Sequence, residues 1–367
     1  ISSATKSEEK LKNVTANVDV ITAEDIESRK FKTVAEALQT ISGIQVSQSG
    51  GIGQQTSLFL RGMDSKKTLV LIDGIRYNDP SGNGANFEHL MINDIERIEV
   101  IKGAQSSIWG ADASAGVINI ITKSAQDGTH GNATIEYGRY NSKIARANIS
   151  HKNENFDAKL SATRVDTDGF SAISPNKSSD AKKYEKDGYE NTTANLKLGY
   201  NFNENNRLST SYEVIDTKVN FDSTPPDDKI SKANTLTHLA NLTYENRNDI
   251  ALTKVYTNYT EIKRDSKSSS GTSNFRGKVK EYGLNTSIDY LSSSNVTMGA
   301  DYKDFEDKEM SKDYDNKGIF ISNTNKFFDD KTIFTQALRY DRYSDFENKT
   351  TGKIGIKQYI IDELNIS

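Results

Sequence analysis

Two short acidic motifs lie close together in one polar stretch of the chain and could bind a metal ion. They are Asp-Thr-Asp-Gly-Phe at residues 166–170 and Glu-Lys-Asp-Gly-Tyr at residues 185–189. Loops that bring several carboxylates together supply the oxygen ligands that calcium takes. Asp-Gly pairs also form ordinary turns at strand ends, and that alternative stays open. Four lysines near the motifs would oppose a bound cation: Lys182, Lys183, Lys186 and Lys218.

Other residues that could carry out chemistry are scattered, and we expect no enzyme. The four histidines lack metal-ligand spacing: His89, His130, His151 and His238. The chain has no cysteine nucleophile and no Gly-x-Ser-x-Gly elbow. The glycine-rich stretch 49–55 is not followed by Gly-Lys-Ser/Thr, and a strand rather than a helix is expected after it, which argues against a phosphate-binding loop.

Composition narrows the class of protein. The 367 residues include 47 basic and 51 acidic side chains, and the net charge of −4 argues against a nucleic-acid partner. The absence of cysteine fits a chain exported without disulfides. The chain contains no run of about 18 apolar residues, so no transmembrane helix is expected. Membrane-spanning β-strands stay possible, because their alternating polar and apolar residues keep the mean hydropathy low. No signal peptide is visible at Ile1, so the sequence reads as mature or trimmed.

The first third of the chain predicts a small α+β unit. Residues 1–17 are polar and typical of a disordered terminus. Thr22 is the expected N-cap of one helix, a second helix is expected over 33–40, and Asp73-Gly74 is a hairpin signal. Asn93-Asp94 is a possible helix cap, and residues 106–116 are small and expected to be flexible. Strands are expected at residues 18–21, 44–47, 57–61, 68–72, 97–101 and 117–122.

From residue 131 onward the pattern changes to about twelve segments of alternating polarity. In the clearest, residues 191–203, alternate positions are apolar and the intervening ones polar, which predicts a large antiparallel sheet. A soluble β-sandwich or propeller is the alternative. Segments of about 10 or more residues at roughly 20-residue spacing, with aromatics near their ends, favour a membrane barrel. Short turns at 203–206, 246–249 and 292–295 alternate with expected long loops at 167–190, 218–234 and 264–274.

Several separate motifs between residues 20 and 123 fall in the order seen in one known family. They are Leu60-Arg61-Gly62, Val-Leu-Ile-Asp-Gly at 70–74, Ile-Glu-Arg-Ile-Glu-Val-Ile-Lys-Gly at 95–103, and the stretch 110–121 that ends Gly-Val-Ile-Asn-Ile-Ile. The segment resembles the plug domain of TonB-dependent outer-membrane receptors, and within that family it looks most like the cobalamin receptors. The resemblance implies a segment after the TonB box at residues 1–17, an α+β plug at 18–125, and a membrane β-barrel from 131 to 367.

The expected barrel is incomplete at residue 367. A plug of about 125 residues should have a radius of gyration near 14 Å, and a barrel of about 12 strands has no lumen for it, whereas 22-stranded transporters carry a plug. An open sheet would also expose two long edges to lipid. The chain ends without a terminal aromatic residue. We therefore expect the N-terminal part of a longer receptor, with residues 1–5 as the tail of the TonB box.

The resemblance also implies a function and site residues. It implies active, TonB-coupled uptake of a large scarce nutrient across the bacterial outer membrane, with cobalamin expected, ferric siderophore as the runner-up and haem third. A passive porin or a surface adhesin is the alternative of another class. Arg76 leaves the siderophore option open. The expected ligand contacts are Gln54, Gln55, Tyr77, Asn78, Asn83 and Asn86, and the expected calcium ligands are Asp168 and Asp187, with Asp216 and Asp222 as weaker candidates.

Overall fold

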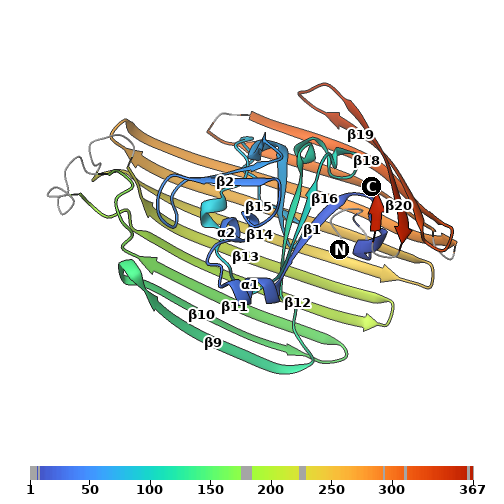
Figure 1. Ribbon diagram of the computed structural model, residues 1–367, viewed down its shortest axis with the longest axis horizontal. Helices are drawn as coiled ribbons and strands as arrows, with labels where there is room; N and C mark the ends of the chain where they lie inside the picture. The colour runs from blue at the N-terminus through green and yellow to red at the C-terminus, as the bar shows by residue number, and fades with distance from the viewer. Residues whose placement is uncertain are drawn as a thin grey trace.

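The computed structural model describes residues 6, 9–174, 184–222, 229–291, 294–309, 312–361 and 364–366. Residues 1–5, where the tail of the TonB box is expected, and Lys182 and Lys183 lie outside the described residues. A small α+β unit at the N-terminal end lies against one side of a long curved sheet (Figure 1). No helix among the described residues is long and apolar enough to cross a membrane.

The α+β unit is built on a five-stranded sheet with the order β1-β7-β8-β5-β6. Strand β5 pairs with β8 in parallel, and the other neighbours are antiparallel. A second sheet has the order β2-β3-β4. The strands are β1 (Asn17–Thr22), β2 (Ile44–Gln48), β3 (Thr56–Leu60), β4 (Met63–Asp64), β5 (Thr68–Ile72), β6 (Ile75–Arg76), β7 (Ile95–Lys102) and β8 (Gly116–Thr122).

The first two helices of this unit begin where the sequence provides capping residues. The hydroxyls of Thr22 and Thr33 each accept the backbone N–H three residues on. In turn, the carboxylates of Asp25 and Glu36 accept the backbone N–H of the cap residue, which forms two capping boxes. The helices are α1 (Ala23–Arg29), α2 (Val34–Leu38) and α3 (Ser106–Trp109), with short 3₁₀ turns η1 (Leu11–Asn13), η2 (Ser65–Lys67), η3 (Phe87–His89) and η4 (Ala111–Ala113). A further 3₁₀ turn, η5 (Arg139–Asn141), belongs to the long sheet.

Three local predictions are wrong. No helix follows Asn93-Asp94, because strand β7 begins directly at Ile95 and pairs with β1 and β8. The stretch 106–116 is not a flexible loop, since it forms α3 and η4 against the sheet wall. The expected long loop at 264–274 is a continuation of two paired strands that turn at residues 269–270, because backbone pairing extends past the apolar part of each strand.

The long sheet contains thirteen antiparallel strands in sequence order among the described residues. The edge strands are β9 and β21, so the described sheet is open. The strands are β9 (Gly128–Gly138), β10 (Ser142–Lys152), β11 (Phe156–Thr167), β12 (Tyr189–Asn203), β13 (Asn206–Asn220), β14 (Lys232–Arg247), β15 (Ala251–Ser268), β16 (Gly271–Leu291), β17 (Ser294–Asp307), β18 (Lys312–Phe327), β19 (Thr332–Tyr343), β20 (Lys349–Ile361) and β21 (Leu364–Ile366).

The side chains of this sheet are arranged with polar groups inside and apolar groups outside. On β12, Asn191 and Thr193 are buried against the plug, whereas Leu196 and Phe202 are exposed. The same inversion recurs along the sheet, where Ile135, Ile319 and many other large apolar side chains are exposed. A soluble sandwich would bury its apolar face. The inversion is typical of a strand set with lipid outside and a polar lumen inside, which confirms the barrel prediction.

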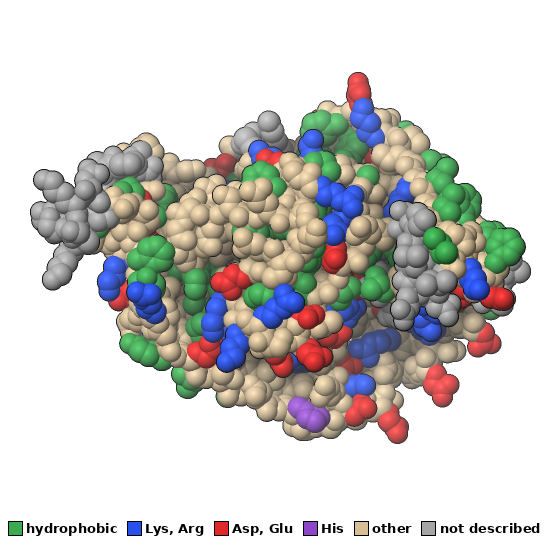
Figure 2. Space-filling view, viewed as in Figure 1, with side chains coloured by type: hydrophobic (Ala, Val, Ile, Leu, Met, Phe, Trp, Pro, Cys, Tyr) green, Lys and Arg blue, Asp and Glu red, His purple; other side chains and the backbone are tan. Residues whose placement is uncertain are grey.

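The α+β unit fills the concave side of the sheet. Its apolar core includes Ile98 and Val100 of β7 and continues into Ile215 and Leu239 of the sheet wall. Strand β6 contacts β14 and β15, and α3 contacts β18, β19 and β20. Figure 2 shows Lys, Arg, Asp and Glu side chains interspersed over the face on which this unit lies.

Candidate functional site

The plug loop at residues 49–55 packs against a loop region of the barrel at the end of the strands where the long connections lie. The amide of Gln54 donates to the carbonyl of Asn220 over 2.7 Å. Gly53 has φ +86°, and a Cβ there would lie 2.1 Å from the ring of Tyr189, so this close approach requires glycine. The ring of Phe170 lies against Gly51. The first predicted ligand-contact loop and the predicted metal-binding loop are therefore neighbours.

Three carboxylates meet where the loops after β11 and β13 come together. Single oxygen atoms of Glu185, Asp187 and Asp222 all lie within 4.8 Å of one another. The side chain of Asp187 is buried and accepts the backbone N–H of Ala172 over 2.6 Å. Asp222 accepts the hydroxyl of Ser171 over 3.1 Å. Like charges brought this close favour a hard cation, and an all-oxygen donor set suits calcium.

The other two predicted calcium ligands lie outside this carboxylate cluster. Asp168 accepts the ammonium of Lys186 over 2.8 Å, and that hydrogen bond lowers the pKa of the Asp168 carboxyl. The ammonium of Lys186 therefore pairs with Asp168, which lies outside the carboxylate cluster. Asp216 is exposed on β13 between the buried residues Ile215 and Thr217, so it lies on the outer face of the sheet.

The second plug loop, residues 77–86, mixes buried and exposed members of the predicted ligand contacts. Asn78 is buried and bonds the backbone of Val70 and Thr68 at 2.7 and 2.9 Å. Tyr77 is fully buried and donates to the carbonyl of Asn86 over 3.1 Å. Asn83 of this loop is exposed. In the first plug loop, residues 49–55, Gln54 is buried and Gln55 is exposed. The loop is tied to the wall by Asp79, whose carboxylate lies 3.6 Å from the guanidinium of Arg264.

A buried ionic cluster connects the N-terminal segment, the plug and the barrel wall. Arg339 is fully buried and makes paired hydrogen bonds of 2.7–2.8 Å to both Asp301 and Asp341. Lys6 lies 3.6 Å from Asp301 and 4.7 Å from the centre of the Trp109 ring. Burial lowers the pKa of Lys6 to about 8. A residue just after the expected TonB box thus lies against the wall formed by the long sheet.

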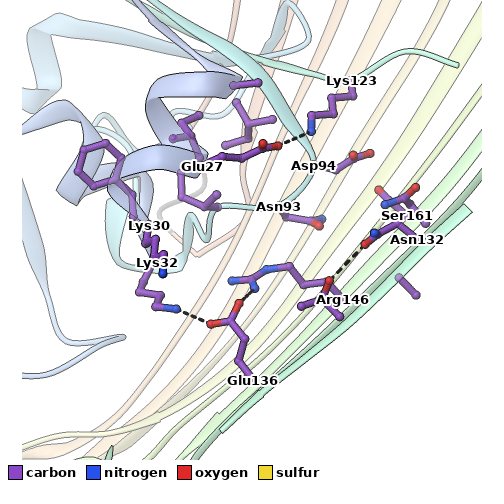
Figure 3. A pocket seen from close by; sticks show the side chains of 18 of the residues that line it. Glu27, Lys30, Lys32, Asn93, Asp94, Lys123, Asn132, Glu136, Arg146 and Ser161 are labelled. Atoms are coloured by element: carbon purple, nitrogen blue, oxygen red, sulfur yellow. Dashed lines mark hydrogen bonds and ion pairs between the residues drawn. The ribbon is translucent and has the colours of Figure 1, made fainter. Parts of the chain in front are cut away.

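A polar crevice of about 720 Å³ separates helix α1 from strands β9–β11 (Figure 3). In it, Glu136 of β9 lies between Lys32 of the plug and Arg146 of β10, and it bonds both. Deeper in the interface, Lys159 pairs with Asp94 over 2.7 Å. On this side the plug is therefore attached to the wall through charged pairs as well as through apolar packing.

Sequence reasoning missed two features of the site. Glu185 belongs to the second acidic motif but is not among the predicted calcium ligands, although it completes the carboxylate cluster with Asp187 and Asp222. The cavity beside α3 was missed because residues 106–116 were expected to be flexible. An aromatic residue at the centre of that small stretch, Trp109, was the available signal.

Comparison with known proteins gives one family model and a consistent set of relatives. Residues 10–117 match the TonB-dependent Receptor Plug Domain. The Vitamin B12 transporter BtuB of Vibrio vulnificus (strain CMCP6) is 29% identical over 99% of this chain and 61% of its own length. The BtuB protein of Vibrio cholerae (strain ATCC 39541) is 43% identical over 34% of this chain and 21% of its own. The chain spans about three fifths of the length of the first of these relatives.

Solved structures with the same fold have much lower identity. The siderophore receptor PirA of Acinetobacter baumannii superimposes with a TM-score of 0.74 at 17% identity, covering 94% of this chain and 59% of PirA. The ferric yersiniabactin uptake receptor FyuA of Yersinia pestis gives a TM-score of 0.74 at 12% identity, covering 95% and 63%. At such identities these likenesses show the fold alone.

Proposed function

We propose, from the premise that this chain belongs to the TonB-dependent receptors of the bacterial outer membrane, that its receptor actively imports cobalamin. The observation that carries the proposal is the similarity to vitamin B12 transporters along nearly the whole chain, joined to a carboxylate cluster beside the plug loop 49–55. No covalent chemistry is required, because import needs only binding and a conformational step.

The carboxylate cluster is the proposed calcium site. Glu185, Asp187 and Asp222 would hold the ion, which would neutralise their mutual repulsion and fix the loops after β11 and β13. Because Phe170 and Asn220 of the same region contact the plug loop 49–55, ordering these loops would also shape the surface over the plug. Asp168 and Asp216 are expected to contribute less, since they lie outside the cluster.

Ligand contacts are proposed at the exposed members of the plug loops. Gln55 and Asn83 present uncharged amides, which suit a bulky polar ligand better than cationic side chains would. The buried Gln54, Tyr77 and Asn78 would act by holding the loops in shape, through the hydrogen bonds described above. Asn86 would act in the same way through its backbone carbonyl, which accepts the Tyr77 hydroxyl.

Energy would reach the plug through its N-terminal segment. TonB would pair with the box ahead of the described residues by strand addition, and pulling on that segment would first meet Lys6 in its ionic cluster. The barrel's exposed apolar outer face would contact the lipid of the outer membrane.

The proposal is tested by titrating cyanocobalamin into the full-length receptor in detergent, with and without calcium. Calcium should tighten binding, and Asp187→Ala combined with Glu185→Ala should weaken it by more than about tenfold, 1.4 kcal/mol. Glu154→Ala removes an exposed carboxylate in the turn at the opposite end of the strands and is the matched control. Asp216→Ala should have little effect on cyanocobalamin binding, because Asp216 is a predicted calcium ligand that lies outside the carboxylate cluster.

Two results would overturn the proposal. Absence of cyanocobalamin binding at micromolar ligand in both conditions, with tight binding of an iron chelate, would make the protein a siderophore receptor. Free leakage of glucose from liposomes that hold the full-length receptor would contradict a plugged transporter and favour a passive porin.

A further inference from the structure

A cavity of about 440 Å³ lies between the plug and strands β17–β20, apart from the plug loops discussed above. The plug contributes Arg76 and the segment 109–112, and the wall contributes side chains from β17, β18, β19 and the connection before β20. Its volume falls in the range of small-ligand sites, about 300–1,000 Å³. It therefore has room for one ring system with its linker rather than for a whole large nutrient.

Four aromatic side chains of the wall make an almost continuous surface in this cavity. Phe305 and Tyr314 stack with centroids 4.5 Å apart and planes 9° from parallel. Phe346 meets Tyr314 edge-on at 5.2 Å and Tyr343 edge-on at 6.1 Å. Phe346 is 61% exposed although it lies in this aromatic group. A large exposed ring that contacts two other rings can stack on a flat ligand ring.

Cationic groups lie at the inner side of the cavity. Arg76 is buried, lies 5.5 Å from the centre of the Phe305 ring, and pairs with Asp112. Lys303 is also buried and pairs with Asp301 over 2.7 Å. At the exposed rim, Lys349 pairs with Glu347. The lining thus contains three cations and two carboxylates, and the third cation, Lys303, has its carboxylate partner Asp301 just behind the lining. An anionic group that enters the cavity would meet Arg76 and Lys303 as charged hydrogen-bond donors.

We infer that this cavity binds a flat aromatic ring that carries an anionic group, with the ring against Phe346 and Tyr314 and the anion toward Arg76 and Lys303. The inference rests on the proposed function, in which the ring is the nucleotide base of a complete corrinoid and the anion is its phosphate. A catecholate of an iron chelate has the same chemistry, a ring with anionic oxygens, and the test distinguishes the two sources.

The test compares a corrinoid that has the nucleotide with one that lacks it. Affinities of cyanocobalamin and dicyanocobinamide are measured by titration on the full-length receptor and on Phe346→Ala. Phe346→Ala should weaken cyanocobalamin about tenfold, because base–aromatic stacking contributes on this scale, and should change dicyanocobinamide less than twofold. Phe346→Tyr retains a ring and should restore cyanocobalamin binding. Because Phe346 is largely exposed in a connection between strands, its removal should leave the barrel folded, which unheated gel mobility checks.

The remaining outcomes distinguish a failure of the inference about this cavity from a failure of the proposed function. If Phe346→Ala and Tyr314→Leu weaken both corrinoids equally, or neither, the nucleotide does not occupy this cavity and the inference is overturned while cobalamin uptake stands. If the wild-type receptor binds neither corrinoid, the proposed function fails, and a ferric catecholate is titrated instead. Weakening of that complex by Phe346→Ala would support the ring-and-anion chemistry, and unchanged binding would overturn it.

Discussion

At the residue scale, burial rather than charge pairing determines the protonation of two neighbouring plug residues. Burial raises the pKa of Glu88 to about 7 and, together with the charge of Arg264, lowers the pKa of His89 to about 3. His89 is stacked on Tyr189, with ring centres 6.2 Å apart and planes 4° from parallel. Both residues lie where the plug meets the wall, so their protonation affects the stability of that interface.

The two groups act on stability in opposite directions as pH changes. The unfolded chain binds a proton at His89 below about pH 6.5 and the folded one does not, so stability is lost as the pH falls from about 6.5 to 3. Folded Glu88 keeps a proton that the unfolded chain releases above about pH 4.5, so stability is lost as the pH rises from about 4.5 to 7. Below pH 4.5 only His89 acts.

We predict that His89→Gln reduces the loss of stability between pH 4.5 and pH 3. The expected gain at pH 3 relative to pH 4.5 is about 2 kcal/mol, at 1.36 kcal/mol for each pKa unit. Thermal unfolding in detergent at pH 3, 4.5 and 7 measures it. Glu88→Gln is the paired variant: the effects of the two groups nearly cancel between pH 4.5 and 6.5 in the wild type, so without Glu88 the stability should rise over that range. Superimposable pH curves for wild type and His89→Gln would contradict the burial argument.

At the element scale, the hairpin between β5 and β6 joins the plug sheet to the barrel through one carboxylate. Asp73 and Gly74 have φ of 50° and 82°, so both turn residues are in the left-handed region that a type I′ hairpin requires. The Asp73 carboxylate accepts the backbone N–H and the hydroxyl of Thr122 at 2.9 and 2.7 Å. It also lies 3.0 Å from the ammonium of Lys197 on β12.

We predict graded losses of stability for substitutions of Asp73. Asp73→Asn keeps a residue that tolerates positive φ but removes the charge, and it should cost about 1–2 kcal/mol. Asp73→Ala should cost about 1 kcal/mol more, because alanine is strained at this φ and bonds neither Thr122 group. Thermal unfolding of both variants, alone and with Lys197→Met, measures the costs. Strict additivity of Asp73→Asn and Lys197→Met would show that the ion pair contributes nothing.

At the scale of the whole molecule, the plug is attached to the wall but is not covalently joined to it away from the linker. Asn93 of the plug and Thr163 of β11 are both buried, and the Thr163 hydroxyl donates to the Asn93 amide oxygen over 2.5 Å. The chain contains no cysteine. A pair of introduced cysteines can therefore lock the plug to the wall at this point without competing thiols.

We predict that Asn93→Cys combined with Thr163→Cys forms a disulfide on oxidation that blocks uptake and spares binding. In the proposed function the plug would have to shift or unfold locally for a ligand to pass. The cross-link would prevent its separation from β11, whereas the plug loops 49–55 and 77–86 would remain free. Uptake of labelled cobalamin by cells, with and without reductant, measures the effect, and each single variant is the control. Undiminished uptake by fully oxidised receptor would show that this side of the plug stays in place during transport.

Short-range regularities made much of the fold predictable from the sequence. The capping residues Thr22 and Thr33 and the turn Asp73-Gly74 act on backbone groups within a few residues, so their effect needs no tertiary context. Alternation along residues 191–203 is equally local, and it already implied a sheet with two unlike faces. The order of the motifs between residues 20 and 123 identified the family.

Only the tertiary structure decided which of these residues meet. Asp187 and Asp222 join Glu185, while Asp216 points to the other face of β13, because strand register and the parity of each position determine where a side chain lies. The aromatic cavity likewise combines Phe305 of β17, Tyr314 of β18 and Phe346 of the connection after β19 with Arg76 of the plug. Contacts between residues so far apart depend on how the plug packs into the sheet, and no local pattern encodes that packing.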